Sequence, residues 1–250
     1  MSYKGEMRMV QEVKKLVKNA KRIVCIMGQE SMTECGGPNL WSPDNFYRIE
    51  KEYGKSPEEM LSAGELTARK VYFYNFYKKE VISKFPEPGP TYTAMKKLQE
   101  AGKLSEIISF NIYGLEYHAG LRNVIELAGS VYANYCPLCK KHYPVEYLIE
   151  SKGTPLCEEC KAAIRPNIRL HSEKVQNDLY TQAVLACRNA DMILVIGGNL
   201  SGSKMRYCTG HYEGDKLVVI HSEPHYTDKY ADYVICDSPK NVLPLLVEGV

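Results

Sequence analysis

Four cysteines form two C-x-x-C pairs in the middle of the chain. They are Cys136 and Cys139 in CPLC, and Cys157 and Cys160 in CEEC, with seventeen residues between the pairs. This spacing is typical of a structural zinc site, in which four thiolates complete a tetrahedral shell. Four unrelated buried cysteines are the alternative, and the doubled spacing argues against it. A closed shell leaves no position for a substrate, so the pattern predicts a metal that stabilises the fold and chemistry that lies elsewhere.

The composition is that of an ordinary globular protein and excludes several partners. Of the 250 residues, 44% are hydrophobic and 25% are charged, and the formal net charge is only +2. Because Lys and Arg are scattered, we expect neither a nucleic-acid nor a membrane partner. The first residues carry charges where a signal peptide needs an apolar core, and no apolar run approaches the roughly 18 residues of a membrane helix. With five further cysteines at irregular spacing, these features indicate a cytoplasmic protein.

Short apolar runs, separated by helical patterns, indicate the framework around the cysteines. Runs rich in β-branched residues, without polar alternation, predict strands that are buried on both faces. They occupy residues 22–28, 107–111, 192–197, 217–221 and 233–236. Helical patterns occupy residues 10–20, 93–101, 173–189 and 240–247. The alternation favours an α/β fold with a doubly wound parallel sheet, in which ligands bind beyond the carboxyl ends of the strands.

Two segments break this alternation and predict a smaller lobe. Residues 39–85 are polar and aromatic, and residues 132–164 contain the cysteine pairs. The aromatic cluster at 72–77 is expected to be a helix that packs on two faces rather than a ligand-binding box. The large domain is therefore predicted to be discontinuous, and it comprises residues 1–38, 86–131 and 165–250.

The middle and end of the chain carry a series of motifs in a characteristic order. NIYGLEYHAG begins at Asn111, NVIEL at Asn123 and GS at Gly129, and the two cysteine pairs follow. Two later segments agree, ADMILVIGG from Ala190 and VVIHSEP from Val218. In order and spacing, the chain resembles the sirtuins over almost its whole length.

This resemblance implies a Rossmann-like large domain and a small lobe that combines helices with a zinc ribbon. Sirtuins use NAD as a substrate and bind it, with an acyl-lysine peptide, between the lobes. The acyl oxygen attacks the nicotinamide ribose, nicotinamide leaves, and a histidine acts as general base on the ribose hydroxyls. The resemblance implies structural zinc at the four cysteines and assigns cofactor binding to Gly28, Ser31, Asn111, Gly197, Gly198, Asn199 and Glu223.

The chain departs from the family at the position of the general base. The family's histidine matches Ala128, whose methyl group accepts no proton, so ordinary general-base chemistry is lost there. The aspartate near the nicotinamide matches Tyr113, although the adjacent Asn111 is kept. No residue is therefore assigned as catalytic. An engineered histidine-to-alanine change could account for Ala128 but not for the other departures.

The loop after the first strand also differs from the family pattern. Met27 and Gln29 replace glycines that let the backbone approach a pyrophosphate, whereas Gly28 and Ser31 are kept. The arginine that usually follows this loop is missing. These changes predict an altered site for the phosphates of a dinucleotide.

Further departures change the charge and the polar groups expected around a nucleotide and a peptide. Glu30 and Glu34 would repel a diphosphate by about 1 kcal/mol per charge pair at 4 Å in water, so NAD binding should weaken unless a cation intervenes. Gly198-Asn199 replaces a threonine-serine pair, and His221 replaces an asparagine. His171-Ser-Glu173 replaces the phenylalanine-glycine-glutamate motif that binds substrate.

Two functions remain open at this point. In the first, the scaffold binds a nucleotide such as NAD or ADP-ribose, an acylated peptide or another protein partner, without ordinary lysine deacylation. In the second, the chain is an NAD-dependent transferase of the sirtuin type, which passes ADP-ribose to a protein or deacylates in an unusual way. Transfer of ADP-ribose has less need of a base on the ribose.

Other side chains could supply the missing base or a nucleophile. The candidate bases are His118, His171, His211, His221 and His225. Cys35, beside two glycines, could be a reactive thiol. For each of them we expect a structural or solvent-exposed role instead, and Pro224 argues against a helix that presents His221 and His225 together to a metal.

Overall fold

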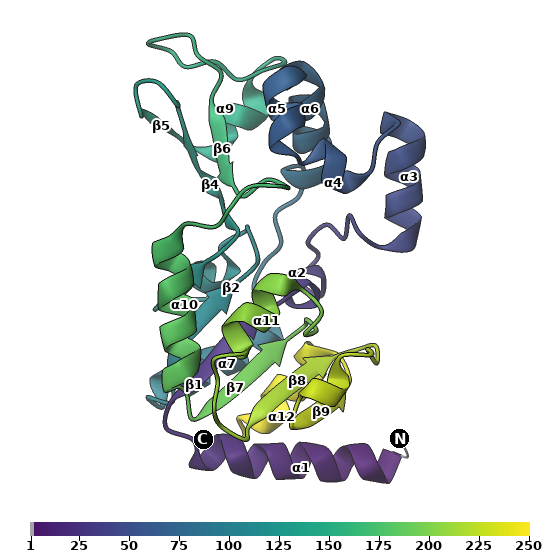
Figure 1. Ribbon diagram of the computed structural model, residues 1–250, viewed down its shortest axis with the longest axis vertical. Helices are drawn as coiled ribbons and strands as arrows, with labels where there is room; N and C mark the ends of the chain where they lie inside the picture. Colours follow the sequence, from purple (N-terminus) through teal and green to yellow (C-terminus); the bar gives the residue numbers. More distant parts are fainter. Residues whose placement is uncertain (1–2) are drawn as a thin grey trace. The chain divides into compact units, whose positions relative to one another are not determined.

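A computed structural model describes residues 3–250 and divides the chain into two units (Figure 1). Unit 1 consists of the residues up to Cys35, Pro86–Leu127 and Gln176–Val250, and unit 2 consists of Gly36–Phe85 and Ala128–Val175. The sequence predicts a similar division but places residues 36–38, 128–131 and 165–175 in the larger domain. All three segments belong to unit 2 in the structure. Residues 165–175 do so because strand β6 (Arg165–Ile168) pairs there with β4 (Gly129–Tyr135).

Unit 1 is built on a six-stranded parallel sheet. Its strands, in spatial order, are β3 (Val124–Glu126), β2 (Leu104–Ser109), β1 (Ile23–Met27), β7 (Met192–Ile196), β8 (Leu217–His221) and β9 (Tyr233–Cys236). Every residue of β1, β7 and β8 is buried, which fits their continuous apolar sequence. The chain order reverses between β1 and β7. Doubly wound sheets usually bind ligands in a crevice beyond the carboxyl ends of the strands at such a reversal point.

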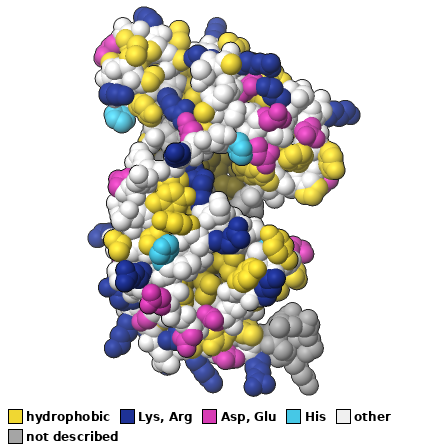
Figure 2. Space-filling model, viewed as in Figure 1, with side chains coloured by type: hydrophobic (Ala, Val, Ile, Leu, Met, Phe, Trp, Pro, Cys, Tyr) yellow, Lys and Arg dark blue, Asp and Glu magenta, His cyan; other side chains and the backbone are white. Residues whose placement is uncertain are grey.

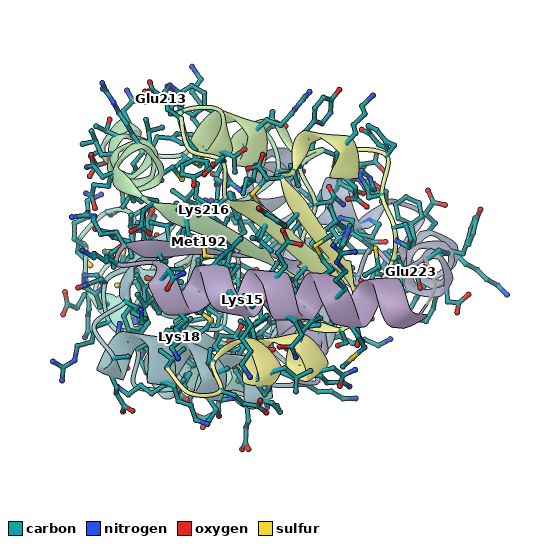
Figure 3. The ribbon with its side chains drawn as sticks, turned by 90° about the horizontal axis from the view of Figure 1, so that it is seen from below. Lys15, Lys18, Met192, Glu213, Lys216 and Glu223 are labelled. Carbon is teal, nitrogen blue, oxygen red and sulfur yellow. The ribbon has the colours of Figure 1, made fainter. Side chains whose placement is uncertain are left out.

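Helices flank this sheet. They are α1 (Tyr3–Asn19), α2 (Gln29–Thr33), α7 (Pro90–Glu100), α8 (Leu115–His118), α10 (Asn177–Asn189), α11 (Ser203–Thr209), the 3-10 helix η2 (Asp228–Tyr230) and α12 (Pro239–Leu246). Four of them, α1, α7, α10 and α12, correspond to the predicted patterns, although α1 begins seven residues earlier than predicted, and the others were not predicted. Helix α1 packs on α12 and β9 (Figure 3). Its Val13 and Val17 are buried, whereas Lys15 and Lys18 are exposed, so α1 is amphipathic as predicted.

The helices of unit 2 explain the aromatic cluster. They are α3 (Pro43–Tyr53), α4 (Pro57–Met60), α5 (Ala63–Ala68), α6 (Lys70–Phe76) and the π-helix η1 (Tyr77–Val81). Phe73, Tyr74, Phe76 and Tyr77 are fully buried, which confirms a helix that packs on more than one face. The hydroxyl of Tyr74 donates a hydrogen bond to the carbonyl of Ile164, which joins α6 to the segment that follows the second cysteine pair.

The second part of unit 2 is an antiparallel sheet with the spatial order β5 (His142–Tyr143), β4 and β6. Helix α9 (Val145–Glu150) follows β5 in the chain. Gly129 opens β4 with a φ of +76°, and a Cβ atom there would lie 2.0 Å from the carbonyl oxygen of Asn167. Only glycine allows this approach of β4 to β6. The adjacent carbonyl of Ala128 accepts a hydrogen bond of 2.8 Å from the amide of Arg169, so Ala128 is fixed by the same pairing.

The surface carries mixed charges. On the face drawn in Figure 2, Lys and Arg side chains are dispersed among acidic and apolar ones, without a continuous basic stripe. In the part of the chain that the structure describes, none of the helices combines the length and apolarity that a membrane crossing needs.

Candidate functional site

Two glycines bring the backbone of β1 and β7 together at the carboxyl edge of the sheet. Gly28 follows β1, and a Cβ atom there would lie 2.4 Å from the carbonyl oxygen of Gly197. Gly197 follows β7 with a φ of +66°, and a Cβ atom there would lie 2.4 Å from the amide nitrogen of Ser31. The amide of Glu30 donates to the carbonyl of Gly197 at 2.8 Å. These contacts place the turn before α2 directly against the end of β7, at the reversal point of the strand order.

Replacing Gly197 by alanine should therefore destabilise unit 1. The left-handed backbone costs about 1–2 kcal/mol for a residue with a Cβ, and displacing the α2 backbone adds roughly 1–3 kcal/mol. The matched control is Gly102→Ala, because Gly102 has a φ of +68° and no atom lies within 4 Å of the point that a Cβ would occupy there. Urea unfolding should show a clearly larger loss for Gly197→Ala. Equal losses would contradict a steric role for Gly197.

Asn111 and Ser31 form a buried polar centre below this edge. Asn111 lies two residues beyond β2 and is 4% exposed, and its Nδ2 donates to Ser31 Oγ at 3.1 Å and to Tyr92 Oη at 3.4 Å. Ser31 Oγ in turn donates to the carbonyl of Gly28 at 2.7 Å. Burial raises the pKa of Tyr92, which keeps its hydroxyl protonated. The polar groups of three elements are thus preorganised around one amide.

Glu116 completes this buried network. Its Oε1 accepts a hydrogen bond of 2.7 Å from Ser109 Oγ, and Ser109 Oγ accepts one of 3.2 Å from the amide of Asn111. Burial raises the pKa of Glu116, although the Ser109 hydroxyl acts in the opposite direction. The segment after β2 is therefore positioned by Ser109 and Glu116 rather than by solvent-exposed groups.

Tyr113 and Ala128 occupy the two positions at which the sequence predicts lost chemistry. Tyr113 is 1% exposed in unit 1 and belongs to its core. Ala128 is 7% exposed and begins the second segment of unit 2, immediately before the Gly129 pairing. Neither side chain can act as a general base near neutral pH, because alanine has no basic atom and a tyrosine hydroxyl is protonated.

The carboxylate of Glu30 spans the edge of the sheet. It accepts a hydrogen bond of 3.0 Å from the amide of Ser222, the residue after β8, and another from the Ser222 hydroxyl. A carboxylate from the first turn of α2 thus accepts a hydrogen bond from the first backbone N–H beyond β8. In a doubly wound sheet, this edge is where nucleotide ligands bind.

The carboxylate of Glu34 caps a helix. It accepts hydrogen bonds from the amide of Lys240 at 2.9 Å and from Ser238 Oγ at 3.2 Å, at the first turn of α12, and a further one from the Thr91 hydroxyl. Burial raises the pKa of Glu34, and these three donors oppose the shift. A negative charge at a helix N-terminus is favourable, so Glu34 stabilises the junction of α2 and α12.

The remaining residues assigned to cofactor binding lie in loops at the same edge of unit 1. Asn199 Oδ1 accepts hydrogen bonds from the amide of Ser201 at 3.0 Å and from its hydroxyl at 2.5 Å, so it stabilises the loop after Gly198. Glu223 is exposed on the loop beyond β8 (Figure 3). Glu173, from the predicted substrate motif, lies in unit 2, where both of its carboxylate oxygens accept hydrogen bonds of 2.7 Å from Arg165 Nη2.

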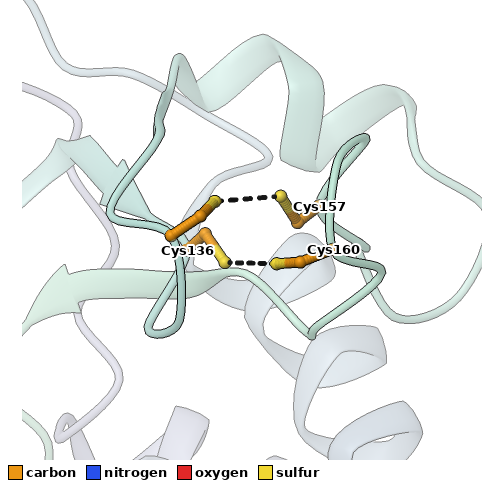
Figure 4. A group of neighbouring side chains, drawn as sticks. Cys136, Cys157 and Cys160 are labelled. Carbon is orange, nitrogen blue, oxygen red and sulfur yellow. Dashed lines mark hydrogen bonds between the residues drawn. The ribbon is translucent and has the colours of Figure 1, made fainter.

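The four cysteines converge on one point in unit 2 (Figure 4). All four sulfurs lie within 4.8 Å of one another, with 3.2 Å between Cys136 and Cys160 and 3.5 Å between Cys139 and Cys157. Zinc–thiolate bonds of about 2.3 Å place neighbouring sulfurs roughly 3.8 Å apart, so the cluster fits a tetrahedral zinc ion.

The two cysteine turns have the same local geometry. The amides of Cys136 and Cys157 donate to the carbonyls of Lys141 and Ala162, five residues later, at 2.8 and 2.7 Å. The residue after the second cysteine of each pair has a positive φ, +65° at Lys140 and +58° at Lys161. This repeated turn directs backbone N–H groups at the sulfurs.

One thiol of this cluster is clearly favoured as a thiolate. The backbone N–H of Cys160 and the hydroxyl of Tyr143, which is 3.1 Å from the sulfur, lower the pKa of Cys157 to about 6. Thiolates are the form that binds metal. The local donors therefore prepare this turn for a cation.

Comparison with known proteins agrees with this fold and these sites. The model of the Sir2 family matches residues 31–202, and an NAD-dependent protein deacetylase of Clostridium tetani is 34% identical over 237 residues, which are 94% of this chain and 96% of the relative. The chain belongs to the Sir2 family.

Two solved Sir2 structures superpose on nearly the whole of this sirtuin. One is a Sir2 protein with a histidine-to-alanine substitution, in complex with a deacetylated peptide and 3'-O-acetyl ADP-ribose. Its TM-score is 0.85 and its sequence identity is 26%, and the comparison covers 96% of this sirtuin and 97% of that chain. The other is Sir2 bound to an acetylated peptide, with a TM-score of 0.82, 26% identity and the same coverage.

The structure of this sirtuin does not favour the alternative nucleophile or bases. Burial raises the pKa of Cys35, so this thiol is not activated. His118, His171 and His211 are exposed, and His225 Nδ1 lies 2.8 Å from Thr227 Oγ1.

Sequence reasoning missed several residues of these sites. Tyr92 belongs to no motif, and Ser222 lies within the VVIHSEP segment but was assigned no role; they are recognised only as partners of Asn111 and Glu30. Asp228 and Cys236 were likewise not predicted to act together with His221. For Cys236 and His221 a signal was available, because each of them ends a predicted strand. Asp228 had no such signal.

Proposed function

We propose that this sirtuin binds an NAD-type dinucleotide and an acylated protein segment but does not carry out ordinary lysine deacylation. The observation that carries this proposal is Ala128 at the position of the family's base. The close backbone approach at Gly28 and Gly197 and the buried amide of Asn111, all in unit 1, support the binding part of the proposal. In this proposal the scaffold binds its ligands but lacks the group that would accept a proton.

The relatives support the binding part of this proposal. The similar bacterial proteins are named NAD-dependent protein deacetylases. The Sir2 protein with a histidine-to-alanine substitution was solved with both a deacetylated peptide and 3'-O-acetyl ADP-ribose. In that protein, a histidine replaced by alanine is compatible with occupation of both ligand sites. By analogy, Ala128 in this chain leaves binding possible while it removes proton transfer.

We also propose that the four-cysteine cluster holds one structural zinc ion. The ligands would be Cys136, Cys139, Cys157 and Cys160, all as thiolates, which close the coordination shell. The zinc would connect the turn after β4 with the turn before β6. Its contribution is to the stability of unit 2 and not to a reaction.

Hydrogen bonds at the sheet edge should reduce nucleotide affinity. The Glu30 carboxylate already occupies the Ser222 amide, and Glu34 adds a second negative charge to the same turn. A diphosphate meets a repulsion of about 1 kcal/mol for each charge pair in water, and more where water is excluded. Affinity for NAD is therefore expected to be lower than it would be with neutral residues at these positions.

NAD-dependent transfer is the second candidate function. Asn111, with Ser31 and Tyr92 behind it, offers a preorganised polar centre next to the crevice. Departure of nicotinamide and capture of the ribose by a protein nucleophile would require less of a base at Ala128. ADP-ribosylation of a protein is the form of this reaction that fits the missing histidine.

Calorimetry combined with a turnover assay tests these alternatives. We expect heat on titration with NAD or ADP-ribose at up to millimolar concentrations, without release of nicotinamide from NAD in the presence of an acetyl-lysine peptide. Glu30→Gln should tighten binding about 5-fold, since 1 kcal/mol of repulsion is removed, and Glu213→Gln, at an exposed distant site, should not.

Three outcomes would distinguish the candidates. Absence of binding at millimolar ligand would contradict the nucleotide-binding proposal. Sustained release of nicotinamide with loss of the acetyl group would contradict the loss of deacylation. Transfer of label from NAD to protein, with the acetyl group retained, would replace the binding function by transferase activity.

A further inference from the structure

A second cluster of metal-binding side chains lies at the carboxyl edge of the sheet in unit 1. His221 is the last residue of β8 and Cys236 is the last residue of β9, and the two are direct neighbours in the parallel pairing. Asp228 opens η2, in the connection between these strands. Three different elements therefore bring an imidazole, a thiol and a carboxylate to one point.

The ligand atoms of these residues are close enough to share one ion. One atom from each of His221, Asp228 and Cys236 lies within 4.8 Å of the others. His221 Nε2 and Asp228 Oδ1 are 3.1 Å apart. Around a zinc ion, bonds of about 2.0–2.3 Å to nitrogen, oxygen and sulfur place neighbouring ligand atoms roughly 3.2–3.7 Å apart. The distance between His221 Nε2 and Asp228 Oδ1 is already close to this range, and the Cys236 sulfur lies within 4.8 Å of both atoms.

The hydrogen bonding of the pair is incomplete in a way that a cation would complete. His221 is 5% exposed, and both His221 Nε2 and Asp228 Oδ1 are buried atoms without a hydrogen-bond partner among the described residues. Their distance is that of a contact, yet their orientation does not make a hydrogen bond. Buried polar atoms without a partner are costly. Two such atoms 3.1 Å apart indicate a site at which a cation would bind both.

The surroundings orient the carboxylate. The other oxygen of Asp228, Oδ2, accepts a hydrogen bond of 2.9 Å from the amide of His225. The Nδ1 atom of His225 lies 2.8 Å from Thr227 Oγ1. Thr227 Oγ1 also accepts a hydrogen bond of 3.2 Å from the amide of Leu200. Such outer contacts are typical of metal sites, because they fix the direction of the ligands.

We propose that His221, Asp228 and Cys236 form a second metal site of this sirtuin, for a divalent transition metal ion such as zinc. Neutral imidazole, carboxylate and thiolate together suit a borderline ion of this type. The two negative ligands would balance its charge. Three protein ligands leave at least one coordination position for water or for a ligand oxygen, in contrast to the closed shell of the four cysteines.

Metal stoichiometry tests the proposal directly. Untagged full-length protein, incubated with excess ZnCl₂ and desalted, should contain two zinc ions per chain by mass spectrometry of the metal. His221→Ala, Asp228→Asn and Cys236→Ser should each contain one. Cys35→Ser and His211→Gln, which alter a half-buried cysteine and an exposed histidine outside the cluster, should both keep two.

A conservative replacement separates loss of a ligand from loss of folding. Cys236→His supplies another metal-binding atom at the same strand end and should restore the second zinc, whereas Cys236→Ser should not, with equal circular dichroism spectra for both. Cobalt titration should give a near-ultraviolet thiolate band whose amplitude falls in Cys236→Ser. One zinc per chain in the unaltered protein, or two zinc ions in His221→Ala and Cys236→Ser, would overturn the proposal and leave a simple imidazole–carboxylate contact.

Discussion

Replacing Cys157 by serine should unfold unit 2. Structural zinc contributes an apparent binding free energy of about 10–16 kcal/mol at neutral pH, and a whole domain is stable by only about 5–15 kcal/mol. The loss falls on unit 2 because β4 runs directly into the first cysteine turn and Tyr74 of α6 bonds to Ile164, just after the second. Hydrogen exchange should show lost protection in residues 128–175 and in α6.

The control for this experiment is Cys208→Ser, which changes a buried cysteine of α11 outside both metal-binding clusters. It should cost only the small amount expected for a hydroxyl in a buried position, and the zinc bound at the four cysteines should remain. A strong chelator should reproduce the effect of Cys157→Ser in the unaltered protein. Unchanged exchange protection of unit 2 after loss of this zinc would contradict the structural role.

Restoring a histidine at position 128 should increase deacylation by about 10²–10⁴-fold, the usual contribution of a positioned general base. Ala128 lies next to Gly129, whose pairing with β6 fixes the backbone, so an imidazole there would start from a defined position. The measurement is removal of acetyl groups from a lysine peptide in the presence of saturating NAD.

Ala128→Phe is the matched control, because phenylalanine has the bulk of a ring without a basic nitrogen. Activity in Ala128→His but not in Ala128→Phe would identify proton transfer as the missing step. If both variants stay inactive while NAD binds, the double variant Ala128→His/Tyr113→Asp tests whether the buried tyrosine also blocks the reaction. An equal gain of activity in both single variants would contradict a base at position 128.

The parallel sheet could be predicted closely from the sequence. The bounds of β8 and β9 match the apolar runs at 217–221 and 233–236, because strands that are buried on both faces leave a continuous apolar signal. The placement of residues 165–175 could not be predicted in this way. It depends on the pairing of β6 with β4, which are far apart in the chain, and β6 itself reads RPNI, without a strand pattern.

The candidate sites also differ in how far they could be predicted from the sequence. The cysteine cluster follows from local spacing, since two turns of the same type present four sulfurs. The contacts of Glu30 and Glu34 were not predictable, because their partners lie about 200 residues away, at Ser222 and at the first turn of α12. From the sequence alone these carboxylates are only charges in a loop. The structure assigns each of them a backbone N–H group.

The contact between Glu30 and Ser222 makes the protein its own competitor at the crevice. An anionic ligand can accept a hydrogen bond from the Ser222 amide only in molecules in which the Glu30 carboxylate has released it, and we call these molecules open. The apparent dissociation constant of such a ligand is the intrinsic constant divided by the fraction of open molecules. Because Glu30 belongs to the turn that Gly197 contacts, opening would also disturb the junction of β1 and β7. Binding of an anionic ligand and the local stability of that junction should therefore both depend on the equilibrium in which Glu30 releases the Ser222 amide.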